Sequence, residues 1–444
     1  MQLLTTDQVA ERLGVKPATV YAYVSRGLLP SRRNAAGKGS LFAKADVDAL
    51  IAGRKRATPN IQTGITLIRD GGLFYRGRDV TVLARESTYE AVAHLLWTGE
   101  LDRVPFPANP EFVALAARVG ALLPPSARLA DRLRVTVAAV AAADPLRFDT
   151  TPAAVVATGR TLTATMVAAL PLRTPSPAGV APVLPMPSAA SAADVSTSTA
   201  SVAGVSVPPA SAADVPVAGV PDAGPSVAGV PDARSSVAVG ALLWPRLTAQ
   251  PMSGTGRRAI EAALVLLADH DIAASTLAAR VAASTRAHPY AVVSAGLAAL
   301  DGPLHGAASE HVHPLLARAV AGEDPVGIIS EHLRVSGGIP GFGHPLYPSG
   351  DPRAAVLFEL LGDHAVREAA AGLAGAARTK SGILPNIDFA LAAFALRYDM
   401  PPDAGEAIFA VARTAGWLAH ALEEYANRPA RFRPSGQYSG RPPV

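Results

Sequence analysis

The feature that most constrains this chain is an apolar periodicity of three to four residues that recurs along most of its length. It is clear in residues 89–96 and 114–123, and it returns in residues 241–244 and 259–268. Apolar side chains at this spacing line one face of an α-helix, whereas the two-residue alternation of a half-buried strand is sparse here. The chain is therefore expected to be mostly α, with a core of packed helices.

Size and composition allow a large core. Of the 444 residues, 49% are hydrophobic, which is ample for two or three domains. The chain has no cysteine, and this excludes disulfides, thiolate metal sites and cysteine nucleophiles. It also lacks a charged leader followed by an apolar core, and any uncharged apolar run long enough to span a bilayer. A cytoplasmic location is expected.

Positive charge is concentrated at the N-terminal end. The formal net charge is +4, yet residues 1–56 carry ten Lys or Arg against four Asp or Glu. The remaining 388 residues carry 30 Lys or Arg against 32 Asp or Glu. Because nucleic acids bind through their phosphates, residues 1–56 are the place where such a partner would bind.

Residues 5–29 carry the signals of two short helices joined by a turn. Thr5 and Gln8 match a capping box, and Gly14 permits the turn. Pro17 suits the first turn of the second helix. On that helix the inward side chains are expected to be Val20, Val24 and Leu28. The exposed side chains are expected to be Lys16, Thr19, Tyr21, Tyr23 and Arg26, followed by Arg32, Arg33 and Lys38 on a wing.

This N-terminal segment resembles the excisionase-like or MerR-like helix-turn-helix family, including a closing helix at residues 41–50. The resemblance implies a small winged helix-turn-helix domain over residues 1–56. Its second helix would enter a major groove if DNA were the partner. Helix-turn-helix modules also dock proteins, and the sequence leaves both roles open.

A low-complexity sequence interrupts the helical pattern between residues 173 and 236. The segment consists mainly of Ala, Val, Pro, Ser and Gly, and Val-Ala-Gly-Val occurs at positions 202, 217 and 227. Small side chains and frequent prolines bury too little apolar surface to offset the entropy of ordering the backbone. We expect residues 173–236 to be a disordered insertion that divides one helical domain into residues 60–172 and 237–444.

Three Gly- or Pro-containing islands each place a titratable side chain in an apolar setting. The islands cover residues 302–310, 341–353 and 385–389, and their titratable residues are His305, His344 and Asp388. A neutral imidazole donor, followed nine residues later by the guanidinium of Arg353, suits an α-keto carboxylate. Ile387 and Phe389 flank Asp388, and they would desolvate its carboxylate and make it a stronger base.

In order and spacing these islands resemble the citrate synthase family. The resemblance extends to four further stretches, at residues 63–77, 89–100, 413–420 and 433–440. It implies a large and a small helical domain with the active site in the cleft between them. The small domain is expected at about residues 307–385.

The resemblance also implies an activity and a set of site residues. The reaction would be an acyl transfer in which acetyl-CoA, oxaloacetate and water give citrate and CoA, a step of the tricarboxylic acid cycle, without a metal or bound cofactor. Asp388 would be the base, with His305 and His344 as hydrogen-bond donors. Oxaloacetate would be bound by His270, Arg353, Arg413 and Arg433. In the family the last arginine comes from the partner subunit, which implies a homodimer.

Alternatives remain at the sequence level. Pro345 stands where central-pathway members of the family usually carry arginine, and Ser309 replaces an asparagine. Pocket residues decide the acyl group, so a 2-methylcitrate synthase that uses propionyl-CoA competes with the first interpretation. A DNA-binding regulator that senses a metabolite is a further alternative, although a sensor needs no base. A metal site at His305, His311 and His313 is disfavoured, because no pair has the spacing of a helical zinc motif.

Overall fold

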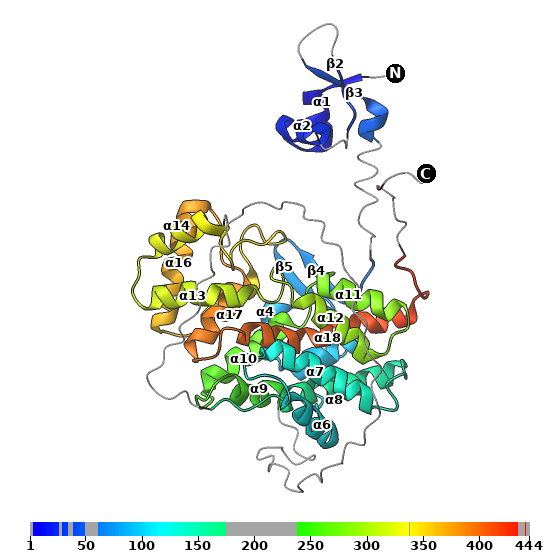
Figure 1. The fold of residues 1–444 in the computed structure, drawn as a ribbon, viewed down its shortest axis with the longest axis vertical. Helices are drawn as coiled ribbons and strands as arrows, with labels where there is room; N and C mark the ends of the chain where they lie inside the picture. The colour runs from blue at the N-terminus through cyan, green and yellow to red at the C-terminus, as the bar shows by residue number, and fades with distance from the viewer. Residues whose placement is uncertain are drawn as a thin grey trace, which may run out of the picture. The chain divides into compact units, whose positions relative to one another are not determined.

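The structure is a computed structural model that describes residues 3–25, 29–33, 39–48, 61–174, 238–336, 338–433 and 440. The expected disordered insertion lies outside these residues, apart from positions 173 and 174. The chain divides into two compact units, Met1–Thr63 and Gly64–Val444 (Figure 1). Within the described residues, no helix is both long and apolar enough to cross a membrane.

The N-terminal unit combines short helices with a three-stranded antiparallel sheet. Its elements are β1 (Leu3–Thr5), α1 (Thr6–Leu13), α2 (Pro17–Ser25), β2 (Arg32–Arg33) and β3 (Ser40–Ala43), with strand order β1-β3-β2. Thr5 and Gln8 form the expected capping box, and Gly14 ends α1 with a left-handed φ of 66°. The predicted winged helix-turn-helix fold is confirmed. The closing helix was expected from residue 41, but residues 41–43 belong to β3, and the described helical residues are 44–48.

A small apolar core holds this unit together. Its fully buried members include Val9, Val20, Leu29, Phe42 and Val47. Tyr21 is half exposed, as expected. The expectation for Tyr23 was wrong, since it packs part-buried against the core. It lies three residues after Val20 and therefore on the same face of α2. Arg26, Leu28 and Lys38 lie outside the described residues.

The second unit opens with an antiparallel ribbon and continues as helices. The ribbon consists of β4 (Thr66–Arg69), β5 (Gly72–Tyr75) and β6 (Arg78–Asp79). Asp70 and Gly71 make its first turn, and both have positive φ, as a two-residue hairpin loop requires. The helices before residue 175 are α4 (Val80–Glu86), α5 (Tyr89–Thr98), α6 (Pro110–Gly120), α7 (Leu129–Ala143) and α8 (Pro152–Ala168).

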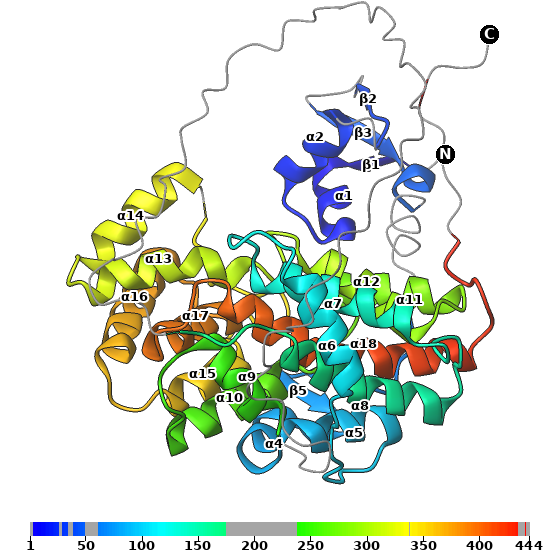
Figure 2. The ribbon, with the colours of Figure 1, turned by 60° about the horizontal axis from the view of Figure 1, so that its bottom comes forward.

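The remaining helices follow residue 237. They are α9 (Val239–Leu247), α10 (Gly254–Leu267), α11 (Ala274–Ser284), α12 (Pro289–Leu300), α13 (Ala308–Val320), α14 (Pro325–Ser336), α15 (Pro352–Leu360), α16 (Ala365–Ser381), α17 (Ile387–Arg397) and α18 (Ala404–Ala426). The prediction of a mostly α protein is confirmed. Figure 2 shows α13, α14 and α16 together on one side of the unit, where they pack against one another and where α13 and α16 also pack against α17.

Helix α18 forms the centre of the unit (Figures 1 and 2). It is buried along most of its length and contacts α5, α7, α8, α10, α11 and α12. A Cβ at Gly416 would collide with Asp269 and with the carbonyl of Ala268, so α18 approaches the end of α10 more closely than any other residue would allow. The Gly416 N–H donates to that carbonyl at 3.0 Å. This approach brings Arg413 on α18 close to the segment that carries His270.

Candidate active site

Six of the seven predicted site residues meet in one neighbourhood, although they come from separate elements. His270 follows α10, and His305 lies in the turn between α12 and α13. His344 precedes α15, Arg353 lies in its first turn, Asp388 lies in the first turn of α17, and Arg413 lies within α18. The rings of His270 and His344 are 5.2 Å apart, and the charge of Arg413 acts on His270, His305 and Asp388.

Hydrogen bonds to Ser275 determine which nitrogen of His305 is free to donate. The backbone N–H of Ser275 donates to His305 Nε2 at 3.4 Å, and the Ser275 Oγ lies 2.8 Å from the same atom. Burial, followed by the charge of Arg413, lowers the pKa of His305 to about 4, so the imidazole is neutral near pH 7. With Nε2 as the acceptor, the single proton lies on Nδ1, which is free to donate.

His344 has the opposite tautomer to His305. The backbone N–H of Leu346 donates to its Nδ1 at 3.2 Å, so the proton of the neutral ring lies on Nε2. Burial and then the charge of Arg353 lower the pKa of His344. The site therefore contains two neutral imidazoles. In each, one nitrogen accepts from a backbone N–H, and the other has no hydrogen-bond partner in the described residues and can donate.

His270 is the most deeply buried of the three histidines. Its Nε2 lies 2.9 Å from the hydroxyl of Tyr347. Burial, followed by the charges of Arg353 and Arg413, holds the pKa of His270 well below its ordinary value. It is thus also neutral, and it adds hydrogen-bonding capacity without a third positive charge.

Asp388 carries a carboxyl group that the protein leaves partly unsatisfied. Asn386 caps α17 by accepting from the Asp388 N–H at 3.0 Å, which fixes the backbone there. Ile387 and Phe389 are buried, as expected, and the Asp388 Oδ1 is buried without a hydrogen-bond partner in the described residues. Burial raises the pKa of Asp388 from 3.8 to about 7, against a lowering by Arg353. Such a carboxyl group is suited to take up a proton near neutral pH.

The two arginines of the site differ in how many of their N–H donors are already paired within the protein. Arg353 is buried and forms a two-pronged ion pair with Asp351, from Nε at 3.0 Å and Nη2 at 2.8 Å. Arg413 is fully buried, and its Nε donates to the carbonyl of Leu267 at 2.8 Å. Both of its Nη atoms are buried without a partner in the described part of the chain. Burial lowers the pKa of Arg413 to about 10. Such an unpaired guanidinium is suited to bind a carboxylate.

Arg433 is the predicted residue that the structure does not bring to this neighbourhood. It lies beyond the end of α18, is exposed, and has no hydrogen bond or ion pair among the described residues. The sequence resemblance assigns it to the partner subunit's site. That assignment stays a prediction.

Sequence reasoning missed three residues that shape the site: Ser275, Tyr347 and Asp351. Besides its ion pair with Arg353, Asp351 accepts from the Ile387 N–H at 3.1 Å, and so connects the start of α15 to the start of α17. Tyr347 and Asp351 lie in the island that contains His344 and Arg353, and this was the available signal. Ser275 had none, because it lies 30 residues before His305.

Two positions depart from the pattern of the family. Ser309 is buried, its Oγ has no hydrogen-bond partner in the described residues, and it lies against Gly405. Pro345 is exposed in the loop immediately after His344. Ser309 and Pro345 thus lie four residues after His305 and one residue after His344.

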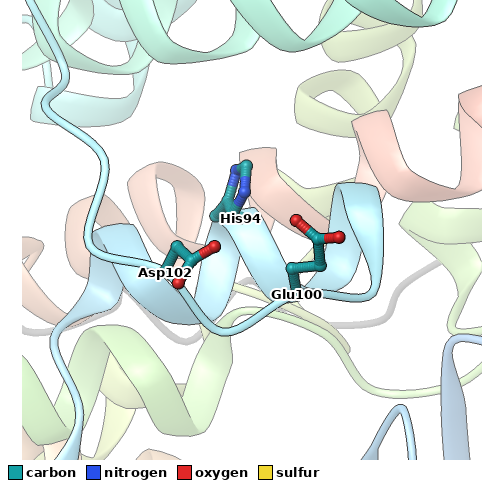
Figure 3. Close-up of side chains that lie close together, drawn as sticks. All are labelled: His94, Glu100 and Asp102. Atoms are coloured by element: carbon teal, nitrogen blue, oxygen red, sulfur yellow. The ribbon is translucent and has the colours of Figure 1, made fainter.

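A separate group of side chains lies at the C-terminal end of α5 (Figure 3). His94, Glu100 and Asp102 have ligand atoms within 4.8 Å of one another, and both carboxylates are exposed. Among the described residues, these three side chains form the one group of at least three His, Asp or Glu that could hold a metal ion. It includes no residue of the active-site candidate and none of His305, His311 and His313.

Comparisons with known proteins identify the family of the chain. The family model for the citrate synthase C-terminal domain matches residues 54–435, and a helix-turn-helix domain model matches residues 3–55. The chain belongs to the citrate synthase family.

Curated relatives match about two fifths of the chain. Citrate synthase 2 of Bacillus subtilis is 37% identical over 189 residues, which cover 41% of this chain and 50% of the relative. The 2-methylcitrate synthase 2 of Corynebacterium glutamicum is 34% identical over 194 residues, which cover 41% and 49%. The chain thus spans about half the length of the curated relatives it matches.

Solved structures share the fold over most of the chain. The citrate synthase of Thermotoga maritima superimposes with a TM-score of 0.60 at 22% identity, covering 87% of this chain and 95% of that one. A citrate synthase of Thermoplasma acidophilum, in a ternary complex with carboxymethyl coenzyme A and oxaloacetate, gives the same TM-score and identity and covers 87% and 96%. The expected citrate synthase-like fold is confirmed.

Proposed function

We propose that this protein condenses acetyl-CoA with oxaloacetate and water to give citrate and CoA. The observation that carries the proposal is the Asp388 carboxyl group, which has a buried, unpaired oxygen and a pKa of about 7. The charges of Arg353 and Arg413 act on Asp388, and they also act on His344 and His305, respectively. Each of these two neutral imidazoles has one nitrogen without a hydrogen-bond partner in the described residues. A base beside two neutral donors is the set of groups that an enolate-forming condensation needs.

The first step forms the carbon nucleophile. Asp388 removes a proton from the methyl group of the thioester, and the electron pair moves to the thioester oxygen. His305, through Nδ1–H, donates a hydrogen bond to this enolate oxygen as negative charge develops there. A neutral donor is effective because its own proton stays on the nitrogen, and the low pKa of His305 keeps the ring neutral.

The second step joins the two substrates. The enolate carbon attacks the keto carbon of oxaloacetate while the thioester carbonyl re-forms, and the electron pair of the keto carbonyl moves to its oxygen, where His344 donates through Nε2–H. This oxygen takes up one proton to become the hydroxyl group of citrate, and Asp388 gives up the proton that it removed from the methyl group, so the carboxylate is restored. The new carbon–carbon bond gives a thioester of citrate. Water then attacks the thioester carbonyl, CoA leaves as the thiol, and citrate is released. No metal or bound cofactor takes part in these steps, and we propose that the enzyme needs none.

Charge binding holds oxaloacetate in place. The unpaired Nη atoms of Arg413 and the remaining Nη1 of Arg353 supply donors for the two carboxylates, with His270 as a neutral neighbour. Arg433 would come from a second copy in a homodimer. The ternary complex of the Thermoplasma acidophilum relative with oxaloacetate and a CoA derivative supports this choice of substrates.

Two other functions have specific support. A 2-methylcitrate synthase, using propionyl-CoA, is favoured by the Corynebacterium glutamicum relative and by the departures at Ser309 and Pro345. A metabolite-sensing regulator is favoured by the helix-turn-helix match at residues 3–55. The unpaired carboxyl oxygen of Asp388 argues for catalysis over sensing, because buried acid without a partner is costly and serves no purpose in binding an anion.

A steady-state assay separates these functions. CoA release by purified full-length protein would be followed with oxaloacetate and either acetyl-CoA or propionyl-CoA. A higher kcat/KM for acetyl-CoA supports citrate formation, and the reverse preference supports 2-methylcitrate formation. Oxaloacetate binding without CoA release from either thioester would support the sensor and contradict the enzyme.

A further inference from the structure

Tyr347 lies at the centre of the residues that would bind oxaloacetate. It is 3% exposed, although it belongs to the loop between α14 and α15. Its hydroxyl lies 2.9 Å from His270 Nε2, and its ring centre lies 4.9 Å from that of His344. The guanidinium carbon of Arg353 lies 5.5 Å from the same ring centre. One side chain thus contacts three residues of the proposed oxaloacetate site.

The ring and the hydroxyl of Tyr347 have separate roles in these contacts. The ring packs against His344 and lies within cation–π distance of Arg353. Among the described residues, the hydroxyl has a hydrogen-bond contact with His270 alone. Because a phenylalanine would keep the ring and lose only the hydroxyl, the two roles can be separated by one substitution.

The hydroxyl and His270 together offer one proton to a bound molecule. Burial raises the pKa of Tyr347 to about 12, so the hydroxyl keeps its proton, and His270 is neutral. If Tyr347 donates to Nε2, the imidazole proton lies on Nδ1 and is free. If Nε2 donates instead, the hydroxyl proton is free. Each arrangement leaves one donor over, and oxaloacetate as a dianion offers only acceptors.

We propose that Tyr347 is a positioning residue for oxaloacetate: its hydroxyl donates to His270 Nε2, which places the imidazole proton on Nδ1, and His270 presents this N–H to the substrate. This inference rests on the proposed function, since it takes oxaloacetate as the ligand. It assigns Tyr347 no role toward the acyl-CoA. Loss of the hydroxyl should therefore weaken the binding of one substrate and not of the other.

The test is Tyr347→Phe in the full-length protein, with oxaloacetate binding measured by titration calorimetry. We expect the Kd for oxaloacetate to rise about tenfold, as for one lost hydrogen bond to a charged ligand. The KM for oxaloacetate should rise in parallel, while kcat and the KM for acetyl-CoA change by less than about threefold. Tyr425→Phe is the matched control, because the Tyr425 hydroxyl donates to the carbonyl of Ala287 at 2.6 Å, away from the site.

A second comparison, with a double variant, distinguishes the loss of this hydrogen bond from a general disruption of the site. In a His270→Asn background, Tyr347→Phe should cause no further loss of oxaloacetate binding, because the hydroxyl acts through His270. An unchanged Kd in the single variant, or an equal further loss in the His270→Asn background, overturns the proposal. Wild-type protein that binds oxaloacetate but releases no CoA would contradict the proposed function alone. Wild-type protein that does not bind oxaloacetate would overturn both.

Discussion

Asp388→Asn should abolish turnover and at the same time stabilise the protein. The amide keeps the size of the side chain but cannot accept the methyl proton, so kcat should fall by at least about a hundredfold. Oxaloacetate binding should remain within about threefold of wild type. The stability gain follows from the buried carboxyl group, which must ionise in the folded protein against its surroundings.

The expected gain can be estimated from the pKa. The pKa of Asp388 is raised from 3.8 to about 7 in the folded state, so the folded protein binds more protons than the unfolded chain between these values. Stability contributed by this group therefore falls as the pH rises from about 4 to about 7. The full cost of ionisation, present above pH 7, is at most about 4 kcal/mol, from about 1.4 kcal/mol for each unit of pKa.

The assay is urea unfolding of wild type and Asp388→Asn at pH 5 and at pH 8. Because asparagine does not titrate, the gain in unfolding free energy should be larger at pH 8 than at pH 5, by about 2–3 kcal/mol. In wild type the rate should also decline as the pH falls below about 7, since protonation removes the base. Turnover within a few-fold of wild type, or a gain that does not depend on pH, would refute the assignment of Asp388 as a desolvated base.

Three further predictions concern binding and domain organisation. Arg413→Leu should raise the Kd for oxaloacetate by about a hundredfold or more in calorimetry, since two unpaired donors are lost, whereas Arg85→Leu, which removes an exposed ion pair, should have no effect. Removing residues 1–56 should spare CoA release and abolish any steeply salt-dependent DNA affinity measured by fluorescence anisotropy; loss of catalysis would refute this division. Replacing residues 174–236 with a short Gly-Ser linker should leave activity and oligomeric state unchanged, because the chain is held on both sides by Arg173 N–H to Pro245 and by Glu90 at the start of α9. An insoluble or inactive product would show that the segment contributes to the fold.

Much of the fold could be predicted from the sequence because its signals are local. Helical periodicity and caps such as Thr5 with Gln8 act over a few residues, and the structure has helices where they occur. The desolvation of Asp388 was predictable for the same reason, since its chain neighbours Ile387 and Phe389 provide the burial. The exposure predicted for Tyr23 was wrong because Tyr23 lies three residues after the buried Val20, and this spacing places both side chains on one face of the helix.

The details of the site depend on contacts between distant residues, which a single sequence does not reveal. The tautomer of His305 depends on Ser275, and Tyr347 lies 77 residues after His270. Asp351 accepts from the Ile387 N–H, 36 residues further along the chain, and this contact depends on how the starts of α15 and α17 meet. These contacts follow from tertiary packing of the helices and not from any local preference.

The most direct test of the central claim is to identify the product formed from acetyl-CoA with a carbon-13 methyl group and unlabelled oxaloacetate. Mass spectrometry would follow the label in reactions with wild type and with Asp388→Asn. The account predicts labelled citrate with wild type, only when oxaloacetate is present, and none with the variant. Labelled acetate in place of citrate would mean thioester hydrolysis without carbon–carbon bond formation. That result, or labelled citrate formed equally by Asp388→Asn, would contradict the account.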